Sequence, residues 1–164
     1  MDPETFNRLI LLLSDKTFRL AKSILKDAEK AKDAVQELNL KLWEKKSLLH
    51  KVDNMPAFIM RSMRNLCLDA VRKQKEEYLL NESMEYEGLN PYQEVENKDM
   101  LMRISSMIDS LPETQRSVIR LRDVEGMEIS EIAYIMQLTE NSVSVNLSRA
   151  RKRIKEQILH EQIR

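Results

Sequence analysis

The sequence predicts an all-α protein in which an acidic linker joins two small helical domains. Leu, Lys, Glu, Met, Arg and Ile dominate the 164 residues, whereas only two glycines and four prolines occur, and this composition favours helices. Apolar side chains recur every three or four residues in both halves of the chain, as they do on one face of a helix. A segment rich in Glu interrupts that period, so we expect two separate helical blocks.

The formal net charge of zero results from cancellation between three blocks. Residues 1–75 hold 16 basic and 10 acidic side chains, whereas residues 76–99 hold one basic and eight acidic side chains. Residues 100–164 hold 10 basic and nine acidic side chains, and six of the basic ones lie in residues 141–164. We therefore expect a basic first domain, an acidic linker, and a second domain whose last helix is basic.

Four helices are predicted in the first domain. Asp2 can cap the first helix, with Pro3 in its first turn, and Ser14 offers the start of a second helix. A third helix is predicted over residues 29–46 and a fourth from Pro56. Four helices with short connections can bury one core.

In the fourth helix, the charged side chains are predicted to share one face. At about 100° per residue, the apolar arc holds Ile59, Met63, Leu66, Ala70 and Val71, and the opposite arc holds Arg61, Arg64, Asn65, Asp69 and Arg72. Residues 57–75 carry five basic side chains and one acid, which suits contacts with phosphates. The alternative is an ordinary solvated face, in which Asp69 only pairs with Arg72.

The second domain is predicted to contain a helix-turn-helix. One helix follows Leu111-Pro112, Gly126 breaks it, and a short helix covers residues 129–136. After a tight turn, Thr139 can cap a long helix whose outward side chains near its start are hydroxyls, amides and arginines. This layout can place hydrogen-bond donors in a DNA major groove, although an ordinary helical hairpin has the same pattern.

Several functions are excluded by what the sequence lacks. With one cysteine, Cys67, and two histidines, His50 and His160, the chain cannot supply a disulfide, a four-ligand zinc site or a Cys/His catalytic pair. It also lacks a glycine-rich phosphate loop, a membrane span and an N-terminal signal segment. We therefore expect a cytoplasmic protein that is not an enzyme and uses no metal, cofactor or small-molecule substrate.

Four segments, in this order, carry a resemblance to a known family. They are Asp33-Ala34-Val35-Gln36-Glu37 with Leu40, Leu42 and Trp43; Phe58-Ile59-Met60-Arg61 with Arg64-Asn65-Leu66-Cys67-Leu68-Asp69 and Arg72; Leu111-Pro112-Glu113 with Gln115-Arg116; and Glu131-Ile132-Ala133 with Val143 and Arg149-Ala150-Arg151. Over nearly its whole length the chain resembles bacterial RNA polymerase sigma factors of the sigma-70 family, extracytoplasmic-function (ECF) subfamily. The resemblance implies a four-helix sigma-2-like domain and a helix-turn-helix sigma-4-like domain. Together these would bind core RNA polymerase, direct it to specific promoters and initiate transcription.

The resemblance also implies roles for particular residues. Docking on the clamp helices of the polymerase's largest subunit would involve Asp33, Gln36, Glu37, Asn39 and Leu40. The path of the minus-10 promoter element would be lined by Arg61, Arg64, Asn65, Asp69, Arg72 and Lys73, and a base flipped from the non-template strand would enter the loop containing His50, Asp53 and Asn54. The minus-35 duplex would face Glu140, Asn141, Ser142, Ser144, Val145, Ser148, Arg149, Arg151 and Lys152.

Two departures from the family pattern affect the second domain. Ser144 and Asn146 stand where the family commonly has basic residues. The logarithm of the DNA-binding constant falls with the logarithm of the salt concentration, and each lost phosphate contact should lower this salt slope by up to about 0.9. Gln137 stands in the turn where the family often has glycine, and a left-handed residue there would cost ~1 to 2 kcal/mol. Another geometry of the turn is therefore left open.

The chain also contains few groups on which bases could stack. It has eight aromatic residues, and Phe58 is the only one in the core segment of the fourth helix. Single strands are usually held on aromatic platforms, so we hypothesise that promoter melting depends on the capture of one or two bases. Robust opening of poorly matched minus-10 sequences in permanganate footprinting would contradict this hypothesis.

The linker and the partners complete the expectations. The 24 linker residues could span roughly 80 Å, which lets the two domains occupy separate promoter elements. The family's habit of threading this segment towards the active cleft supports a second hypothesis, that its charge imitates nucleic acid on the polymerase. The resemblance implies an anti-sigma factor as a further partner. The rival class is a stand-alone helix-turn-helix transcriptional regulator, which would bind promoter DNA without core polymerase.

Overall fold

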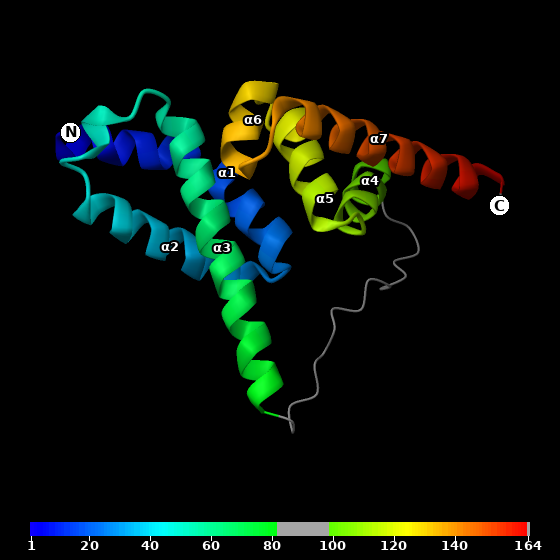
Figure 1. Ribbon diagram of the computed structural model, residues 1–164, viewed down its shortest axis with the longest axis horizontal. Coiled ribbons are helices and arrows are strands. Elements are labelled where there is room, and N and C mark those ends of the chain that lie inside the picture. Colours follow the sequence, from blue (N-terminus) through cyan, green and yellow to red (C-terminus); the bar gives the residue numbers. More distant parts are fainter. Residues whose placement is uncertain (82–98, 164) are drawn as a thin grey trace. The chain divides into compact units, whose positions relative to one another are not determined.

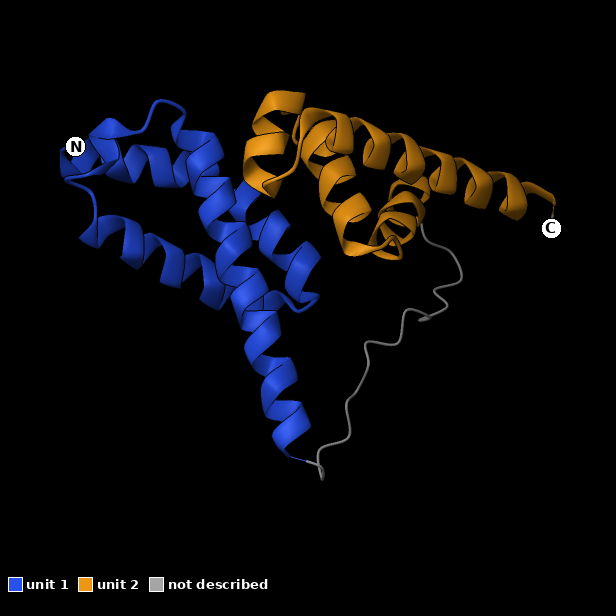
Figure 2. Cartoon of the chain, in the orientation of Figure 1, with its two compact units in different colours: residues 1–86 blue, residues 87–164 orange. Residues whose placement is uncertain are grey.

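The fold was obtained as a computed structural model, which describes residues 1–81 and 99–163. Within these ranges the chain forms seven α-helices, a 3-10 turn and a π-helical turn, and it contains no strand. The chain divides into two compact units, residues 1–86 and 87–164 (Figure 2). The predicted all-α fold with two helical units is confirmed.

Three long helices build the first unit (Figure 1). They are α1 (Pro3–Leu25), α2 (Ala28–Glu44) and α3 (Met55–Leu80), and the 3-10 turn η1 (Leu49–Lys51) lies between the last two. The Asp2 carboxylate accepts the backbone N–H of Thr5 at 2.9 Å, and hydrogen bonds from Thr5 lower the pKa of Asp2. The predicted cap at the start of α1 is therefore present.

The predicted second helix start at Ser14 is wrong, because α1 continues through this residue. The Ser14 hydroxyl donates to the carbonyl of Leu11 at 3.1 Å, and the Thr17 hydroxyl donates to the carbonyl of Leu13 at 3.0 Å. Both hydroxyls thus bond back within the helix and cap nothing. The first unit therefore has three α-helices and a 3-10 turn where four helices were expected.

The core of the first unit is apolar and is formed by all three helices. Its buried residues are Phe6, Leu13, Leu20, Ala21, Ile24, Ala31, Ala34, Leu38, Leu42, Leu49, Ala57, Ile59, Met60, Met63 and Cys67. Beyond Leu68, every residue of α3 is exposed, including Ala70 and Val71, which the pattern placed inside. Figure 1 shows this C-terminal half of α3 extending away from α1 and α2. Residues 76–80 of the predicted linker are helical, whereas residues 82–98 lie outside the described ranges.

Shorter elements build the second unit and pack against one long helix. They are α4 (Met100–Asp109), α5 (Glu113–Ile119), the π turn η2 (Arg120–Val124), α6 (Ile129–Met136) and the long α7 (Glu140–Ile163). The apolar face of α7 presents Val143, Leu147, Ala150 and Ile154, and all four are buried. This repeat at three or four residues is the one that predicted the helix.

The turn between α6 and α7 adopts the left-handed geometry that Gln137 makes costly. Gln137 has φ 56° and ψ 44°, and the N–H of Leu138 donates to the carbonyl of Ala133 at 3.0 Å. The Thr139 hydroxyl then accepts the N–H of Ser142 at 3.1 Å, as the predicted cap requires. Gln137 thus adopts the left-handed conformation, and the turn has no alternative geometry. The helix-turn-helix prediction is confirmed.

Candidate interfaces for polymerase and promoter DNA

The outward face of α2 gathers the residues predicted to bind polymerase. Asp33, Gln36, Glu37 and Leu40 are exposed, and Asn39 is half-buried at the edge of the same face. Ala31, Ala34, Leu38 and Leu42 hold the opposite face in the core. Leu40 is 60% exposed, and Lys41 pairs with Glu37 at 2.8 Å. An exposed leucine among acids and amides is a combination suited to a protein partner.

The connection between α2 and α3 holds the residues predicted to receive a flipped base. His50 and Asp53 are exposed, and His50 Nδ1 lies 2.5 Å from the carbonyl of Ser47. The Asn54 carboxamide caps α3, because its Oδ1 accepts the N–H of Ala57 at 3.0 Å. Asn54 therefore sets where α3 starts, in addition to any contact with DNA.

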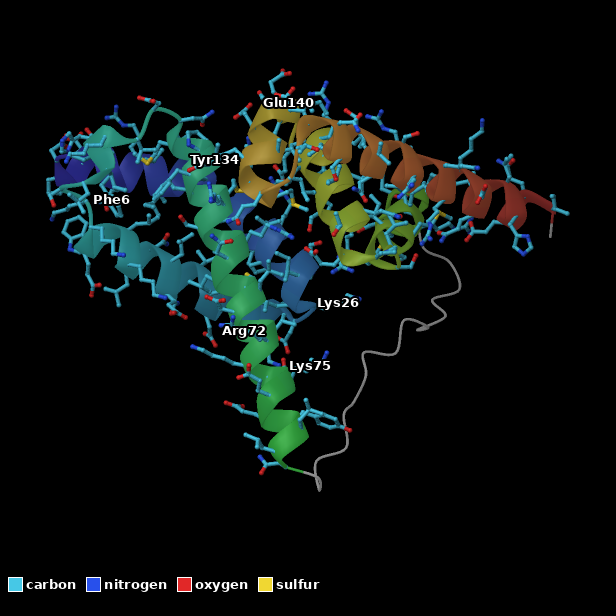
Figure 3. All side chains as sticks on the ribbon, viewed as in Figure 1. Phe6, Lys26, Arg72, Lys75, Tyr134 and Glu140 are labelled. Carbon is cyan, nitrogen blue, oxygen red and sulfur yellow. The ribbon has the colours of Figure 1, made fainter. Side chains whose placement is uncertain are left out.

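The exposed side of α3 presents most of the residues predicted for the minus-10 element. Asn65, Asp69, Arg72 and Lys73 are exposed and Arg61 is half-buried. Figure 3 shows Arg72 and Lys75 on the part of α3 that extends beyond the other helices. Arg72 Nη2 lies 3.3 Å from Asp69 Oδ1, so the ion pair considered as the alternative role of Asp69 does form.

Arg64 differs from the other predicted residues of this face because it is buried. Only 7% of Arg64 is exposed, because it follows Met60 by four residues and precedes Cys67 by three, so it shares their buried stripe. A guanidinium that the protein already surrounds cannot reach a DNA backbone without repacking of the bundle. We therefore expect Arg64 to act mainly in the packing of the first unit.

The start of α7 presents a continuous polar arc opposite its buried face. The predicted minus-35 residues Glu140, Asn141, Ser144, Val145, Ser148, Arg149 and Lys152 are all exposed, and Figure 3 shows Glu140 at the beginning of the helix. Ser142 is half-buried, and its carbonyl accepts the Asn146 side-chain N–H at 2.8 Å. Hydroxyls, amides and cations thus share one face, as reading of a major groove requires.

Arg151, which is also exposed, already has a partner within the second unit. Its Nε and Nη2 donate to Oδ2 and Oδ1 of Asp123 at 3.0 and 2.6 Å, and this hydrogen bonding raises the pKa of Arg151. The position explains the pairing, since Arg151 follows the buried Leu147 by four residues and lies beside the packed face of α7. Two of its N–H groups are thus used within the second unit, whereas the side chain remains about half exposed.

The π turn η2 ties two helices of the second unit together. The N–H of Glu125 donates to the carbonyl of Arg120 at 2.9 Å, the five-residue step of a π turn. Arg120 at one end of the turn pairs with Asp109 of α4 at 2.6 Å, and Asp123 near the other end pairs with Arg151 of α7. Two ion pairs therefore fix α4 and α7 to the same turn.

A groove next to η2 is a feature that the sequence patterns did not predict. It has a volume of about 470 Å³ and is lined by α4, the end of α5, η2 and α7, chiefly through Ile104, Ile108, Ile119, Val124, Ile154, Ile158 and Leu159. The signal was present in the apolar repeat of α7, which continues to Ile158 after the residues that the core covers. An apolar groove with Arg151 and Lys155 beside it suits an amphipathic partner.

Neither a metal centre nor a reactive thiol is found in the described part of the chain. No group of three metal-ligating His, Cys, Asp or Glu side chains occurs in residues 1–81 and 99–163. Cys67 is fully buried beside Met63, with 3.6 Å between the sulfur atoms, and burial raises the pKa of its thiol to about 12. None of the described helices combines the length and the apolar character needed to cross a membrane.

Comparison with known families assigns the class of protein. The family described as sigma-70 region 2 matches residues 9–77, and the family described as sigma-70, region 4, matches residues 101–154. These segments coincide with α1 to α3 and with the helix-turn-helix unit. The chain belongs to the sigma-70 family, and it is a sigma factor that directs RNA polymerase to promoters.

Similar proteins place the chain in the extracytoplasmic-function subfamily. It is 24% identical to the ECF RNA polymerase sigma factor SigW of Bacillus subtilis, over 96% of this chain and 90% of that protein. RNA polymerase sigma factor SigV of the same organism is 28% identical, over 89% and 86%. The sigma factor RpoE of Bartonella quintana, solved in complex with the anti-sigma factor NepR, has a similar fold with a TM-score of 0.78, 24% identity and coverage of 93% and 96%.

Proposed function

We propose that the two units of this sigma factor divide promoter recognition between them. The observation that carries the proposal is that each unit presents one exposed polar face with several cations, on α3 in the first and on α7 in the second. The face of α3 would contact the minus-10 element through Arg61, Asn65, Asp69, Arg72 and Lys73, and that of α7 would read the minus-35 duplex. In vitro transcription with core polymerase on a genomic promoter library tests this and yields both consensus elements.

Polymerase docking is proposed for the exposed face of α2. Leu40→Ala removes an exposed apolar side chain from that face, and Leu12→Ala is a matched control, because Leu12 is 71% exposed on α1. Binding of the Leu40 variant to core polymerase should be weaker by about 5-fold or more, as for an interface anchor, and that of the Leu12 variant unchanged. Equal binding by both variants would remove α2 from the interface.

A stand-alone regulator makes a different prediction in a simple mobility-shift assay. A regulator should shift promoter duplex by itself at physiological salt, whereas this chain should bind weakly alone and specifically after core polymerase is added. The two-unit arrangement favours a sigma factor over a stand-alone regulator, because the first unit has its own basic helix face. We propose that the chain works in the cytoplasm without catalysing a reaction itself.

Regulation by an anti-sigma factor is proposed from the groove of the second unit. The solved relatives include RpoE bound to NepR and CnrH bound to the cytosolic domain of CnrY, the latter at 21% identity with a TM-score of 0.68. Such a partner would cover the apolar groove beside η2 and the α2 face that carries exposed Leu40. Affinity capture with the full chain, compared with an Ile158→Asp variant, tests whether the groove is used.

A role for the acidic linker is proposed from charge alone. If its carboxylates imitate nucleic acid on a basic polymerase channel, neutralising Glu82, Glu85, Glu87, Glu94 and Glu96 should weaken holoenzyme assembly or alter abortive synthesis. Unchanged assembly and unchanged abortive products would leave the segment as a spacer.

A further inference from the structure

Asn146 of α7 is hydrogen-bonded to Ser142, which lies one helical turn before it. Its Nδ2 donates to the carbonyl of Ser142 at 2.8 Å, and the same nitrogen lies 3.4 Å from the Ser142 hydroxyl oxygen. Both residues are half-buried, so they lie at the edge of the polar arc. Where the family pattern leads us to expect a basic residue, this chain therefore has an amide that bonds to its own helix.

The carbonyl of Ser142 determines which way the Asn146 amide points. A carboxamide has a donating nitrogen and an accepting oxygen, and only the nitrogen can bond to a carbonyl oxygen. The 2.8 Å contact therefore keeps Nδ2 on the side of Ser142 and turns Oδ1 away from it. Rotation of the amide by half a turn would bring two oxygen atoms together, so the observed orientation is favoured.

This orientation leaves the Ser142 hydroxyl as a donor. A serine hydroxyl has one hydrogen and two lone pairs, and it rotates to suit its neighbours. With Asn146 Nδ2 next to the Ser142 oxygen, the hydrogen of that hydroxyl points elsewhere. The Ser62 hydroxyl bonds back to the carbonyl of Phe58 at 2.8 Å, whereas Ser142 donates to no side chain or carbonyl within residues 1–81 and 99–163. Its O–H is thus available to a ligand.

The other serines of the polar arc have no such constraint. Ser144 and Ser148 are exposed, and in the described part of the chain neither side chain has a hydrogen-bond partner. Their hydroxyls can donate or accept, so they can bond to either kind of base edge. Ser142 can bond only to an acceptor, such as a purine N7, guanine O6 or thymine O4, and not to the amino group of adenine or cytosine.

We propose that Asn146 is a positioning residue that holds the Ser142 hydroxyl as a hydrogen-bond donor, so that Ser142 recognises an acceptor on one base edge of the minus-35 duplex. The inference rests on the proposed function of α7 and adds Asn146 to the residues that set its specificity. A cation at position 146 would bind a phosphate and would carry no sequence information, whereas a fixed donor discriminates between base edges.

Selection of promoter sequences by the complete holoenzyme tests this role. The full chain and core polymerase are incubated with a promoter library randomised across the minus-35 element, and the bound DNA is sequenced. Ser142→Ala should reduce the preference at one base position by about 2- to 10-fold, the range for one hydrogen bond. The other positions of the selected motif should keep their preferences.

Asn146→Asp should reverse the preference at that same base position. An ionised carboxylate only accepts hydrogen bonds, so it should take the hydrogen of the Ser142 hydroxyl and leave the oxygen facing the base. The favoured edge should then be the amino group of adenine or cytosine. The added negative charge should weaken binding to all sequences alike and leave the other preferences in place. Asn146→Leu, which is neutral and similar in size, should relax the preference at this position without reversing it.

A double variant shows whether Asn146 acts through Ser142. Ser142→Ala/Asn146→Asp should have the base preference of Ser142→Ala alone, because no hydroxyl is left for the carboxylate to orient. Circular dichroism and urea unfolding of each variant establish that α7 is still folded. A merely structural role of Asn146 would change these two measurements and would not reverse the preference at a single base position.

The outcomes distinguish this inference from the proposed function. If the wild-type holoenzyme selects a minus-35 motif that Asn146→Asp leaves unchanged, the positioning role is overturned and the proposed function stands. If Asn146→Asp alters the motif equally with and without the Ser142 hydroxyl, Asn146 contacts the base directly and the positioning role is again overturned. If the wild-type holoenzyme selects no minus-35 motif, the proposed function of α7 fails and the inference fails with it. A reversal at one position that requires Ser142 supports the inference.

Discussion

Asp123 and Arg151 form a two-contact ion pair across 28 residues of sequence. The Arg151 guanidinium donates through Nε and Nη2 to both carboxylate oxygens, at 3.0 and 2.6 Å, and thereby joins the π turn to the middle of α7. Planar pairing of this kind is geometrically specific. Both side chains are partly exposed, so the contribution to the unfolding free energy is about 1 kcal/mol.

Arg151→Ala and Lys152→Ala should therefore change different properties, although the two residues are neighbours. The first should affect stability and the second should affect DNA binding. Arg151→Ala should lower the unfolding free energy by about 1 kcal/mol and leave the salt dependence of promoter binding unchanged. Lys152→Ala should leave the unfolding free energy unchanged and should lower the salt slope of promoter binding by the holoenzyme by up to about 0.9. Urea unfolding and salt titrations measure the two quantities, and a double-mutant cycle with Asp123→Ala isolates the pair. A reduced salt slope in the Arg151 variant would place that residue back among the DNA contacts.

Gln137→Gly should stabilise the second unit. Its φ of 56° is strained for any residue with a Cβ, so glycine should raise the unfolding free energy by about 1 kcal/mol. Gln137→Ala is the control that removes the side chain and keeps the strain. Gly126→Ala should have the opposite sign, because Gly126 has φ 70° and a Cβ there would meet no atom within 4 Å, so the cost is purely conformational. Thermal unfolding of the wild type and the three variants measures these differences, and equal melting temperatures for Gln137→Gly and Gln137→Ala would contradict the role of backbone strain.

Burial of the Cys67 thiol should make stability fall at alkaline pH. Its pKa in the folded chain is about 12, against an ordinary value of 9.0. Between these values the folded protein keeps a proton that the unfolded chain has released, so the unfolding free energy decreases as pH rises above 9, by about 1.4 kcal/mol per pH unit. Cys67→Ala should show a shallower decline from pH 9 upwards in urea titrations. Because other groups titrate in the same range, the difference between the two slopes is the relevant quantity, and parallel curves would contradict the prediction.

Arg64→Ala and Arg72→Ala should separate packing from DNA binding on one helix. Arg64 is buried, so its truncation should lower the unfolding free energy by about 1 to 3 kcal/mol, the usual range for loss of buried contacts. Arg72 is exposed with a partner at its own helix surface, so its truncation should leave stability nearly unchanged and reduce promoter opening. Chemical unfolding and permanganate footprinting measure the two effects. A stable Arg64 variant with defective opening would return Arg64 to the minus-10 contacts.

The helical class, the two units and the caps at Asp2 and Thr139 could be predicted because they depend on spacing and on residues next to one another. The misplaced helix start at Ser14 shows the limit of that reasoning, since a serine hydroxyl can cap a new helix or bond back within a continuing one, and only the tertiary contacts of α1 decide. Arg151 has a partner 28 residues away in sequence, which local spacing cannot reveal, and Arg64 lies in the buried stripe of α3 although its charge placed it on the outer arc. Charge alone therefore did not reveal that Arg64 is buried or that Arg151 is paired with Asp123.

The uncovered half of α3 has a consequence for how far the first unit can reach. From Asp69 to Leu80 every residue is exposed, so these twelve helical residues depend mainly on local contacts such as backbone hydrogen bonds and the Asp69–Arg72 pair, and isolated helices of that length are marginal in water. As a helix they extend about 18 Å, whereas the same residues as extended chain span about 40 Å. Unwinding of this half would therefore lengthen the connection to the second unit by roughly 20 Å. The same number of residues could then serve promoters with different distances between the minus-10 and minus-35 elements.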